Sequence, residues 1–428
     1  MKTRIIVILL LVFSGCWLMG QREIRVTLDE GIPLIPVAVP AFTLISGSQP
    51  DESLQDELYQ TFLADLSYSR VFVLISEKYY DYIDRFDPEN ILYKDWASIQ
   101  AKILVAGKLE IVGSDRIVFQ IRVYDVDSER FIFGKSFSGD RKLVRVIAHK
   151  CADEMMKYFG ETPFFDTKIA FVSTRDGNEE IYFMDYDAHR KTRVTFNEYI
   201  DLLPTWSSDN QKLLYTSYRR GECDLYTFHL YTGELSILSS GGTNYSADWC
   251  RDHNKIVYTS TKNDGNAEIY VKDMDSGRET RLTFNRIIDT SPSWSPSGSE
   301  IVFVSQRSGN PHIFIMNASG ANIRKISSGG THHDSPDWSP DGSRIVYVSM
   351  VNWRLDLFIF NLKNNRVTKL TQNAGRNEMP TWSPDGRHVI FASDRSGQYQ
   401  IYTVDYDGKN LRQLTFQGKN TMPSWQKK

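Results

Sequence analysis

The feature that most constrains the fold is a tryptophan that returns every 43 to 45 residues through the C-terminal half of the chain. In five of its six copies it stands in the motif Pro-x-Trp, and the best-preserved copies continue with Ser-Pro-Asp-Gly, as at 336–342 and 380–386. The six residues are Trp206, Trp249, Trp294, Trp338, Trp382 and Trp425. A period of about 40–45 residues that carries several short strands is typical of a β-propeller, with one blade per repeat.

Each repeat contains four short apolar runs separated by turn residues, which predicts a four-stranded antiparallel blade. The first repeat begins at Lys168 with its second strand, whereas the last repeat ends on an unaccompanied tryptophan strand, Thr421–Trp425. A closed ring of six blades resolves this mismatch, because the final strand then becomes the innermost strand of the first blade. Closure also removes two open sheet edges. We therefore predict a six-bladed β-propeller over residues 168–428, closed by the C-terminal strand.

The first residues predict export from the cytoplasm. Lys2 and Arg4 precede the short apolar run Ile5–Phe13, which is too short to span a bilayer, so residues 1–20 are typical of an export signal. Two ways of processing it remain open. The stretch ending at Cys16 resembles a bacterial lipoprotein box, which would leave Cys16 lipidated and the protein anchored to a membrane, and ordinary cleavage nearby is the alternative.

Residues 21–160 show no trace of the repeat and predict a small α/β domain. Ile35–Phe42 contains two prolines and is expected to be an edge strand. Leu54, Leu58 and Phe62 recur every four residues, as on the buried face of a helix. Three strands and a final helix follow, and residues 161–167 form a linker. The predicted fold is thus two-domain: a small N-terminal α/β domain followed by the all-β propeller.

The composition provides no reason to expect nucleic acid as a partner, since the net charge is only -3. The nearest approach to a metal cluster is His332-His333-Asp334, and adjacent histidines of one strand point apart. The chain lacks the Gly-x-Ser-x-Gly motif of a serine-hydrolase nucleophile elbow. We therefore predict a protein that is not an enzyme and needs neither metal nor other cofactor.

Several local motifs point to a family. Ile35-Pro-Val-Ala-Val-Pro-Ala-Phe42, Val105-Ala-Gly-Lys-Leu109, Thr167–Ser173 and the terminal Pro-Ser-Trp425, together with the six blades, resemble the TolB family, the periplasmic components of the Tol–Pal envelope system. The resemblance implies a periplasmic, monomeric protein. It also implies that the propeller mouth binds the peptidoglycan-associated lipoprotein Pal and that the N-terminal segment, with Glu23, Ile24, Arg25 and Val26, binds the C-terminal domain of TolA.

The same resemblance implies a role in outer-membrane integrity and in constriction at cell division. Two alternatives remain beside it: an exported propeller enzyme with a cation in its channel, and a periplasmic scaffold with a different partner.

The predicted partner site is the ring of connections between successive blades, where rigid strands present variable loops around a funnel. Each connection ends just before the tryptophan strand, and each contributes a pair of residues. The twelve candidates are Ile200, Asp201, Asn244, Tyr245, Ile288, Asp289, His333, Asp334, Asn377, Glu378, Asn420 and Thr421. The alternative interpretation is that these acids and amides cap turns of solvated loops.

Overall fold

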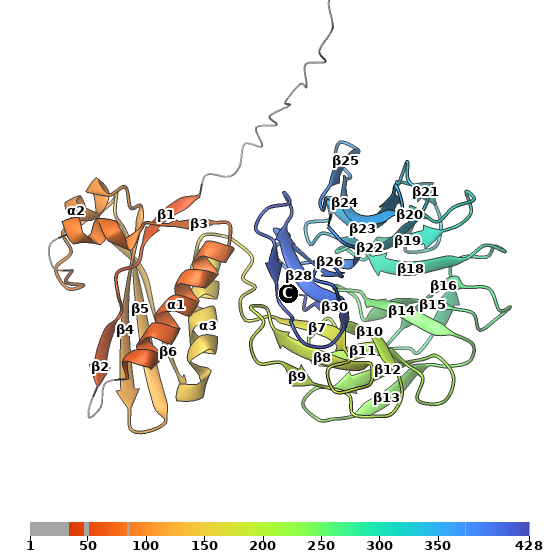
Figure 1. The fold of residues 1–428 in the computed structure, drawn as a ribbon, viewed down its shortest axis with the longest axis horizontal. Helices are drawn as coiled ribbons and strands as arrows, with labels where there is room; N and C mark the ends of the chain where they lie inside the picture. Colours follow the sequence, from red (N-terminus) through yellow and green to blue (C-terminus); the bar gives the residue numbers. More distant parts are fainter. Residues whose placement is uncertain (1–33, 47–50, 84–85, 373, 428) are drawn as a thin grey trace, which may run out of the picture.

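The computed structural model describes residues 34–46, 51–83, 86–372 and 374–427. It contains an N-terminal α/β domain beside a β-propeller (Figure 1), which confirms the predicted fold class. The predicted export signal at 1–20, Cys16 and the segment Glu23–Val26 lie outside the described residues. Within the described ranges no helix is both long and apolar enough to cross a membrane.

The N-terminal domain is built on one mixed sheet whose strands run in the order β3-β1-β4-β5-β6, with β2 pairing β4 beyond the end of β1. Helices α1 and α3 cover the face that looks toward the propeller, and α2 lies on the other side of the sheet (Figure 1). The elements are β1 (Ile35–Ala38), β2 (Thr43–Ser46), α1 (Glu52–Tyr68), β3 (Phe72–Leu74), α2 (Tyr93–Ser98), β4 (Ile103–Val112), β5 (Arg116–Asp125), β6 (Arg130–Asp140) and α3 (Val144–Tyr158).

Helix α1 shows why the local sequence folds as it does. The Asp51 carboxylate accepts a hydrogen bond from the Leu54 amide at 3.1 Å and so caps the first turn. Leu58 and Phe62, one turn apart, are completely buried against the sheet. One expectation was wrong: β1 is not an edge strand, because it pairs with both β3 and β4. Pro36 is tolerated there since its carbonyl still accepts a hydrogen bond from the Lys102 amide.

The propeller consists of six four-stranded antiparallel sheets. We number the blades along the chain and name the strands of each blade inner, second, third and outer, from the channel outward. Blade 1 is β30 (Asn420–Trp425), β7 (Lys168–Ser173), β8 (Glu180–Asp185) and β9 (Thr192–Arg193); blade 2 is β10 (Asp201–Trp206), β11 (Lys212–Ser217), β12 (Asp224–His229) and β13 (Leu235–Ser239); blade 3 is β14 (Asn244–Trp249), β15 (Lys255–Ser260), β16 (Glu268–Asp273) and β17 (Glu279–Arg281).

The remaining blades follow the same plan. Blade 4 is β18 (Asp289–Trp294), β19 (Glu300–Ser305), β20 (His312–Asn317) and β21 (Arg324–Lys325); blade 5 is β22 (His333–Trp338), β23 (Arg344–Val351), β24 (Arg354–Asn361) and β25 (Arg366–Lys369); blade 6 is β26 (Asn377–Trp382), β27 (His388–Ser393), β28 (Gln400–Asp405) and β29 (Arg412–Gln413).

The repeated turn motif explains the hairpin between the inner and second strands. In blade 5, the Asp341 carboxylate accepts a hydrogen bond from the Ser343 amide at 3.1 Å, and Gly342 takes the positive φ of 68°. The tryptophan that precedes each turn packs into the core between blades, and all six are at most 7% exposed. The ring closes as predicted, because β30, the last strand of the chain, pairs with β7.

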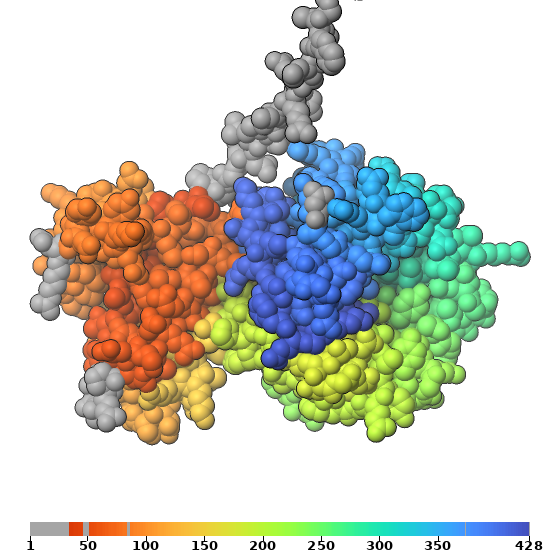
Figure 2. Space-filling model, in the orientation of Figure 1, coloured from red at the N-terminus to blue at the C-terminus, as the bar shows by residue number. Residues whose placement is uncertain are grey.

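The two domains meet over the ends of blades 1 and 6, where the turns between inner and second strands and between third and outer strands lie. His149 of α3 sits between Asp65 of α1, at 2.8 Å, and Asp187 of blade 1, at 3.4 Å. Arg70 forms ion pairs with Asp405 and Asp407 of blade 6. Figure 2 shows the N-terminal domain pressed against this side of the propeller.

The interface also contains an apolar part. Phe164 and Phe165, which fall within the predicted linker, are completely buried there, and the ring of Tyr68 stacks on that of His388 with centroids 4.0 Å apart. We call this end of the propeller the domain face. The opposite end, which carries the blade-to-blade connections and the hairpins between second and third strands, is the mouth face.

Candidate partner-binding face

The inner strands begin at the mouth face, and each begins with a polar residue whose side chain is buried. These six residues belong to the predicted set, and none is more than 1% exposed: Asp201, Asn244, Asp289, His333, Asn377 and Asn420. Each lies five positions before its tryptophan. Their shared position places them inside the blades rather than on the surface that a partner would meet.

Hydrogen bonds show what these buried side chains do. The amides of Asn244, Asn377 and Asn420 donate to the carbonyl oxygen three residues earlier, at 3.1, 3.2 and 2.9 Å. Asp201 and Asp289 each accept from an asparagine amide four residues earlier at 2.7 Å. All of them therefore anchor the connection that enters their blade, in agreement with the turn-capping interpretation.

His333 plays the same part with an imidazole. Its Nε2 lies 2.6 Å from the Gly329 carbonyl oxygen, and its ring stacks on His312 with centroids 4.9 Å apart. Burial lowers the pKa of His333 to about 4, so the ring is neutral at physiological pH. Its neighbour His332 instead faces Asp334, with Nε2 and Oδ2 3.7 Å apart. The two histidines thus point to different partners and do not converge.

The other six predicted residues are accessible at the mouth. Ile200 and Ile288 are 40% and 41% exposed, and Tyr245, Asp334, Glu378 and Thr421 are half-buried. The two groups arise because the predicted pairs are not in register: Ile200 and Ile288 precede the inner strand, whereas the other four follow its first residue. Counting back five positions from each tryptophan separates them.

Sequence reasoning missed an apolar rim on the same face. Phe196, Phe284 and Phe416 occupy equivalent positions just after the outer strands of three blades and are 71–75% exposed. Arg193 and Arg281 lie over the rings of Phe196 and Phe284 at 4.8 and 5.1 Å. The signal was present in the sequence, since each of the three phenylalanines directly follows a threonine just beyond the outer strand. Exposed aromatic side chains of this kind are common in protein interfaces.

A ring of basic side chains surrounds the mouth inside this rim. In five blades a basic residue stands two positions after the serine that ends the second strand: Arg175, Arg219, Lys262, Arg307 and Arg395. Arg307 donates to the buried carboxylate of Asp289 at 2.8 Å, and Arg395 donates to the Asn377 side-chain oxygen at 2.6 Å. These two basic groups thus help to hold the first residue of an inner strand.

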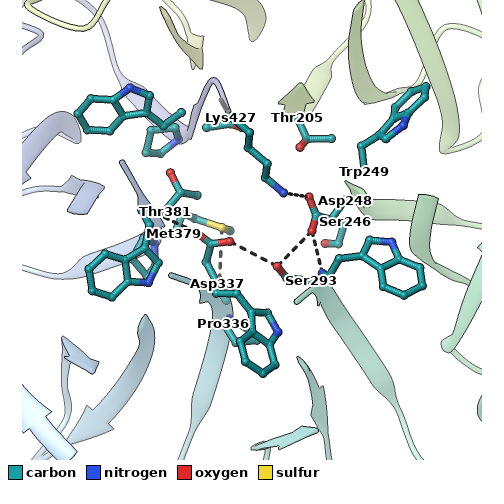
Figure 3. Close-up of a pocket in the computed structure, with 18 of the residues that line it drawn as sticks. Thr205, Ser246, Asp248, Trp249, Ser293, Pro336, Asp337, Met379, Thr381 and Lys427 are labelled. Atoms are coloured by element: carbon teal, nitrogen blue, oxygen red, sulfur yellow. Dashed lines mark hydrogen bonds and ion pairs between the residues drawn. The ribbon is translucent and has the colours of Figure 1, made fainter. Parts of the chain in front are cut away.

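The central channel opens inside the ring of tryptophan strands and encloses a cavity of about 220 Å³ (Figure 3). The carboxylates of Asp248 and Asp337 face each other across this cavity. The Lys427 ammonium lies 2.6 Å from Asp248, and Ser293 contacts both Asp248 and Asp337 at 3.2 and 3.4 Å. Burial raises the pKa of Asp337 to about 6, although the Lys427 ammonium opposes this rise.

The channel carboxylates also join neighbouring blades. Asp248 accepts a hydrogen bond from the Trp294 amide and Asp337 accepts one from the Trp382 amide, both at 2.8 Å. Across the described part of the chain, no group of three or more His, Cys, Asp or Glu side chains is placed to hold a metal ion. The cationic group that this channel presents to Asp248 is Lys427, next to the last residue of the chain, and no sequence pattern singles it out.

Comparison with known proteins decides the family. A family model described as the TolB beta propeller domain matches residues 156–354 and 331–428, and the TolB amino-terminal domain matches residues 23–132. The chain belongs to the TolB family. The Tol–Pal system protein TolB of Desulfosudis oleivorans is 32% identical over 279 residues, which cover 63% of this chain and 62% of that protein.

Two further matches place the chain beside solved and curated relatives. A TolB homolog of Chlorobium luteolum is 33% identical over 211 residues, or 49% of this chain and 48% of that protein. The matched segments thus span less than two thirds of these TolB relatives. The crystal structure of TolB from Acinetobacter baumannii superposes with a TM-score of 0.79 at 22% identity, covering 93% of this chain and 98% of that one, which supports the fold.

Proposed function

We propose that this TolB-family chain acts in the periplasm as a non-enzymatic adaptor whose propeller mouth binds the Pal-like, peptidoglycan-associated lipoprotein of the Tol–Pal system. The observation that carries the proposal is the difference between the two ends of the propeller in what covers them and what they expose. The N-terminal domain covers part of the domain face, whereas the mouth face carries the exposed Ile200, Ile288 and the phenylalanine rim. A wide face with separate apolar anchors suits a folded protein better than a small substrate.

The second half of the proposal concerns the segment before β1. By family resemblance, residues Glu23–Val26 engage the C-terminal domain of TolA, and the protein couples the two partners during outer-membrane constriction at division. Whether Cys16 carries a lipid or is removed with the export signal decides only how the protein is tethered. Neither proposal needs a cofactor.

The rival function, an exported propeller enzyme with a channel cation, meets a specific obstacle. Lys427 already brings a positive charge to the Asp248 carboxylate, so a metal ion there would have to compete with a covalently attached ammonium. A thermal-shift screen against divalent cations tests this rival directly. A saturable, micromolar stabilisation by one cation, lost in the Asp248→Asn variant, would favour the enzyme or metal-binding interpretation.

Pull-down from envelope extract with the mature chain tests the adaptor function itself. The matched bait is a double variant, Ile200→Ser with Ile288→Ser, whose changes lie at exposed positions of the mouth face. Recovery of the Pal-like lipoprotein by the parent and its loss with the double variant supports the proposal. Equal recovery by both baits would show that the partner binds elsewhere.

A further inference from the structure

The hairpin between the second and third strands of blade 5 is paired over more of its length than its counterparts. Strands β23 and β24 pair over eight positions, from Arg344 with Asn361 to Val351 with Arg354, whereas the equivalent strands of the other five blades pair over six. The six residues between Ser349 and Asp356 equal in number the loops of blades 1, 2, 4 and 6, but in blade 5 two further residue pairs leave only a two-residue turn at the tip. Two backbone hydrogen bonds to the preceding blade connection hold the base of this hairpin. The Thr331 amide donates to the Met350 carbonyl oxygen at 3.2 Å, and the Met350 amide donates to the His332 carbonyl oxygen at 2.8 Å.

The turn at the tip of this hairpin has an unusual residue. Asn352 and Trp353 have φ angles of 53° and 62°, as in a two-residue type I′ turn. Asparagine suits the first position, but the second position favours glycine, because a side chain in the left-handed region is strained. A tryptophan there is the more notable since its side chain is 93% exposed and gains little from packing. Folding alone therefore favours another residue at 353.

The same hairpin interrupts the basic ring. Val351 occupies the position at which the other five blades carry Arg175, Arg219, Lys262, Arg307 or Arg395. A partner that covers this part of the mouth face meets the apolar side chains of Val351 and Trp353, with the exposed Arg354, the cross-strand partner of Val351, beside them. Blade 5 thus differs from the other blades both in the regular pairing of its hairpin and in the side chains that the hairpin presents.

We infer that Trp353, at the tip of the regularly paired hairpin of blade 5, is a primary anchor for the protein partner of the mouth face and inserts into an apolar pocket of that partner. This inference rests on the proposed function, because it assumes that a folded protein covers the mouth. The indole offers a flat apolar surface and one N–H donor, so the fitting pocket is lined by aliphatic or aromatic side chains and contains a carbonyl acceptor. Tryptophan is prominent among the residues that dominate binding energy in protein interfaces.

The geometry favours a protein over a lipid surface. Stable attachment to a bilayer from its surface requires a broad apolar face together with clustered basic residues. Here one indole projects from a narrow hairpin, and the other exposed apolar residues of the mouth face, Ile200, Ile288 and the phenylalanine rim, are distributed over several blades and do not join into one apolar face with it. A folded domain seated on the mouth contacts the hairpin and these residues together.

The strained turn provides a test in which stability and binding move in different directions. Trp353→Gly replaces a strained residue by one that adopts positive φ freely, so its melting temperature should equal or exceed that of the parent. Calorimetric titration with the soluble domain of the Pal-like lipoprotein from the same cells should show binding weakened on the order of ten-fold or more. Trp353→Asn, which also tolerates this conformation, should behave in the same way.

Tyr231→Gly is the matched control, because Tyr231 is 82% exposed in a turn on the domain face, and it should bind like the parent. If the parent binds and both Trp353 variants bind equally well, the inference is overturned while the proposed function stands. If the parent itself does not bind the Pal domain, the proposed function fails and the inference fails with it. Sedimentation of the parent, but not of Trp353→Gly, with vesicles of phosphatidylethanolamine and phosphatidylglycerol would overturn the inference in favour of a lipid contact.

Discussion

Trp425, in the last strand of the chain, pairs with Ile169, in the first strand of the propeller, and its indole Nε1 donates a hydrogen bond to Thr167 Oγ1 at 2.9 Å. The two ends of the propeller sequence are thereby joined both through the sheet and through a side chain. Trp425 is 2% exposed and contributes to the core that the propeller shares with the N-terminal domain.

Replacing Trp425 by alanine should therefore lower the free energy of unfolding by about 3–5 kcal/mol, the usual cost of removing a buried tryptophan. Deleting residues 420–428 should lower the free energy of unfolding further, because the deletion opens the ring and exposes two sheet edges. Chemical denaturation monitored by tryptophan fluorescence measures both effects. Trp353→Ala is the control and should change stability little, because that side chain is exposed. Unchanged unfolding of the truncated chain would refute closure by β30.

The channel lysine leads to a second prediction. Lys427→Met leaves the largely buried Asp248 carboxylate without its ammonium partner; because the Lys427 side chain is 34% exposed, the cost should fall below the about 3–5 kcal/mol of a fully buried pair. Adding Asp248→Asn to the same chain removes the uncompensated charge, so the double variant should be more stable than Lys427→Met alone. Thermal unfolding of the three variants measures this order. A double variant no more stable than Lys427→Met would contradict it.

The same site has a defined pH dependence. The folded-state pKa of Asp337 is raised to about 6, above its value in the unfolded chain, so the stability that this group contributes is present at low pH and is lost as the pH rises toward and through 6. Removing Lys427 raises that pKa further, and the deficit of Lys427→Met relative to the parent should be larger at pH 8 than at pH 5. An equal deficit at both pH values would show that Lys427 does not act on the titration of Asp337.

The domain interface should respond to pH in a higher range. Burial alone would lower the pKa of His149, but the carboxylates of Asp65 and Asp187 raise it to about 10. Because the pKa of His149 is higher in the folded protein than in the unfolded chain, its contribution to stability is complete below about pH 6.5 and is lost as the pH rises toward 10. His149→Gln should melt at a lower temperature than the parent at pH 7, with a difference that shrinks by pH 10. His253→Gln, at an exposed position, is the control.

The sequence predicted the repeating parts of this structure far better than the features that occur only once. Each tryptophan and each strand of a blade recurs six times, and the turn after the tryptophan recurs five times, so periodicity alone specified the blades and their closure. The interface pairs of His149 with Asp65 and Asp187 occur once, between residues far apart in the chain, and no local pattern points to them. Phe164 and Phe165 were included in a linker because the glycine and proline before them suggested one, yet both are buried between the domains.

The candidate site shows the same contrast. The blade connections were placed at the mouth by topology, but which residue of each pair is buried depends on where the inner strand begins. Asp201 and Asn244 begin strands and anchor loops, whereas Ile200 and Tyr245, their neighbours on opposite sides in sequence, remain accessible. Lys427 could not be anticipated, because the only indication of its role is the position of its side chain in the channel.

The N-terminal segment gives a prediction about the second partner. Deleting residues 21–30 removes Glu23–Val26 and should abolish binding of the TolA C-terminal domain while leaving Pal binding intact or stronger. Surface plasmon resonance against both immobilised domains measures this. Loss of both interactions would mean that the segment is required for folding and not specifically for recognition of TolA.

The most direct test of the adaptor function is calorimetric titration of the mature protein, and of its Ile288→Ser variant, with the purified soluble domain of the Pal-like lipoprotein. Ile288 is 41% exposed on the mouth face, so the substitution should leave the melting temperature unchanged and cost on the order of 1–2 kcal/mol of binding free energy. Tyr231→Ser, on the domain face, should bind like the parent. If Ile288→Ser binds normally and Tyr231→Ser binds weakly, the partner occupies the domain face, which contradicts binding at the mouth.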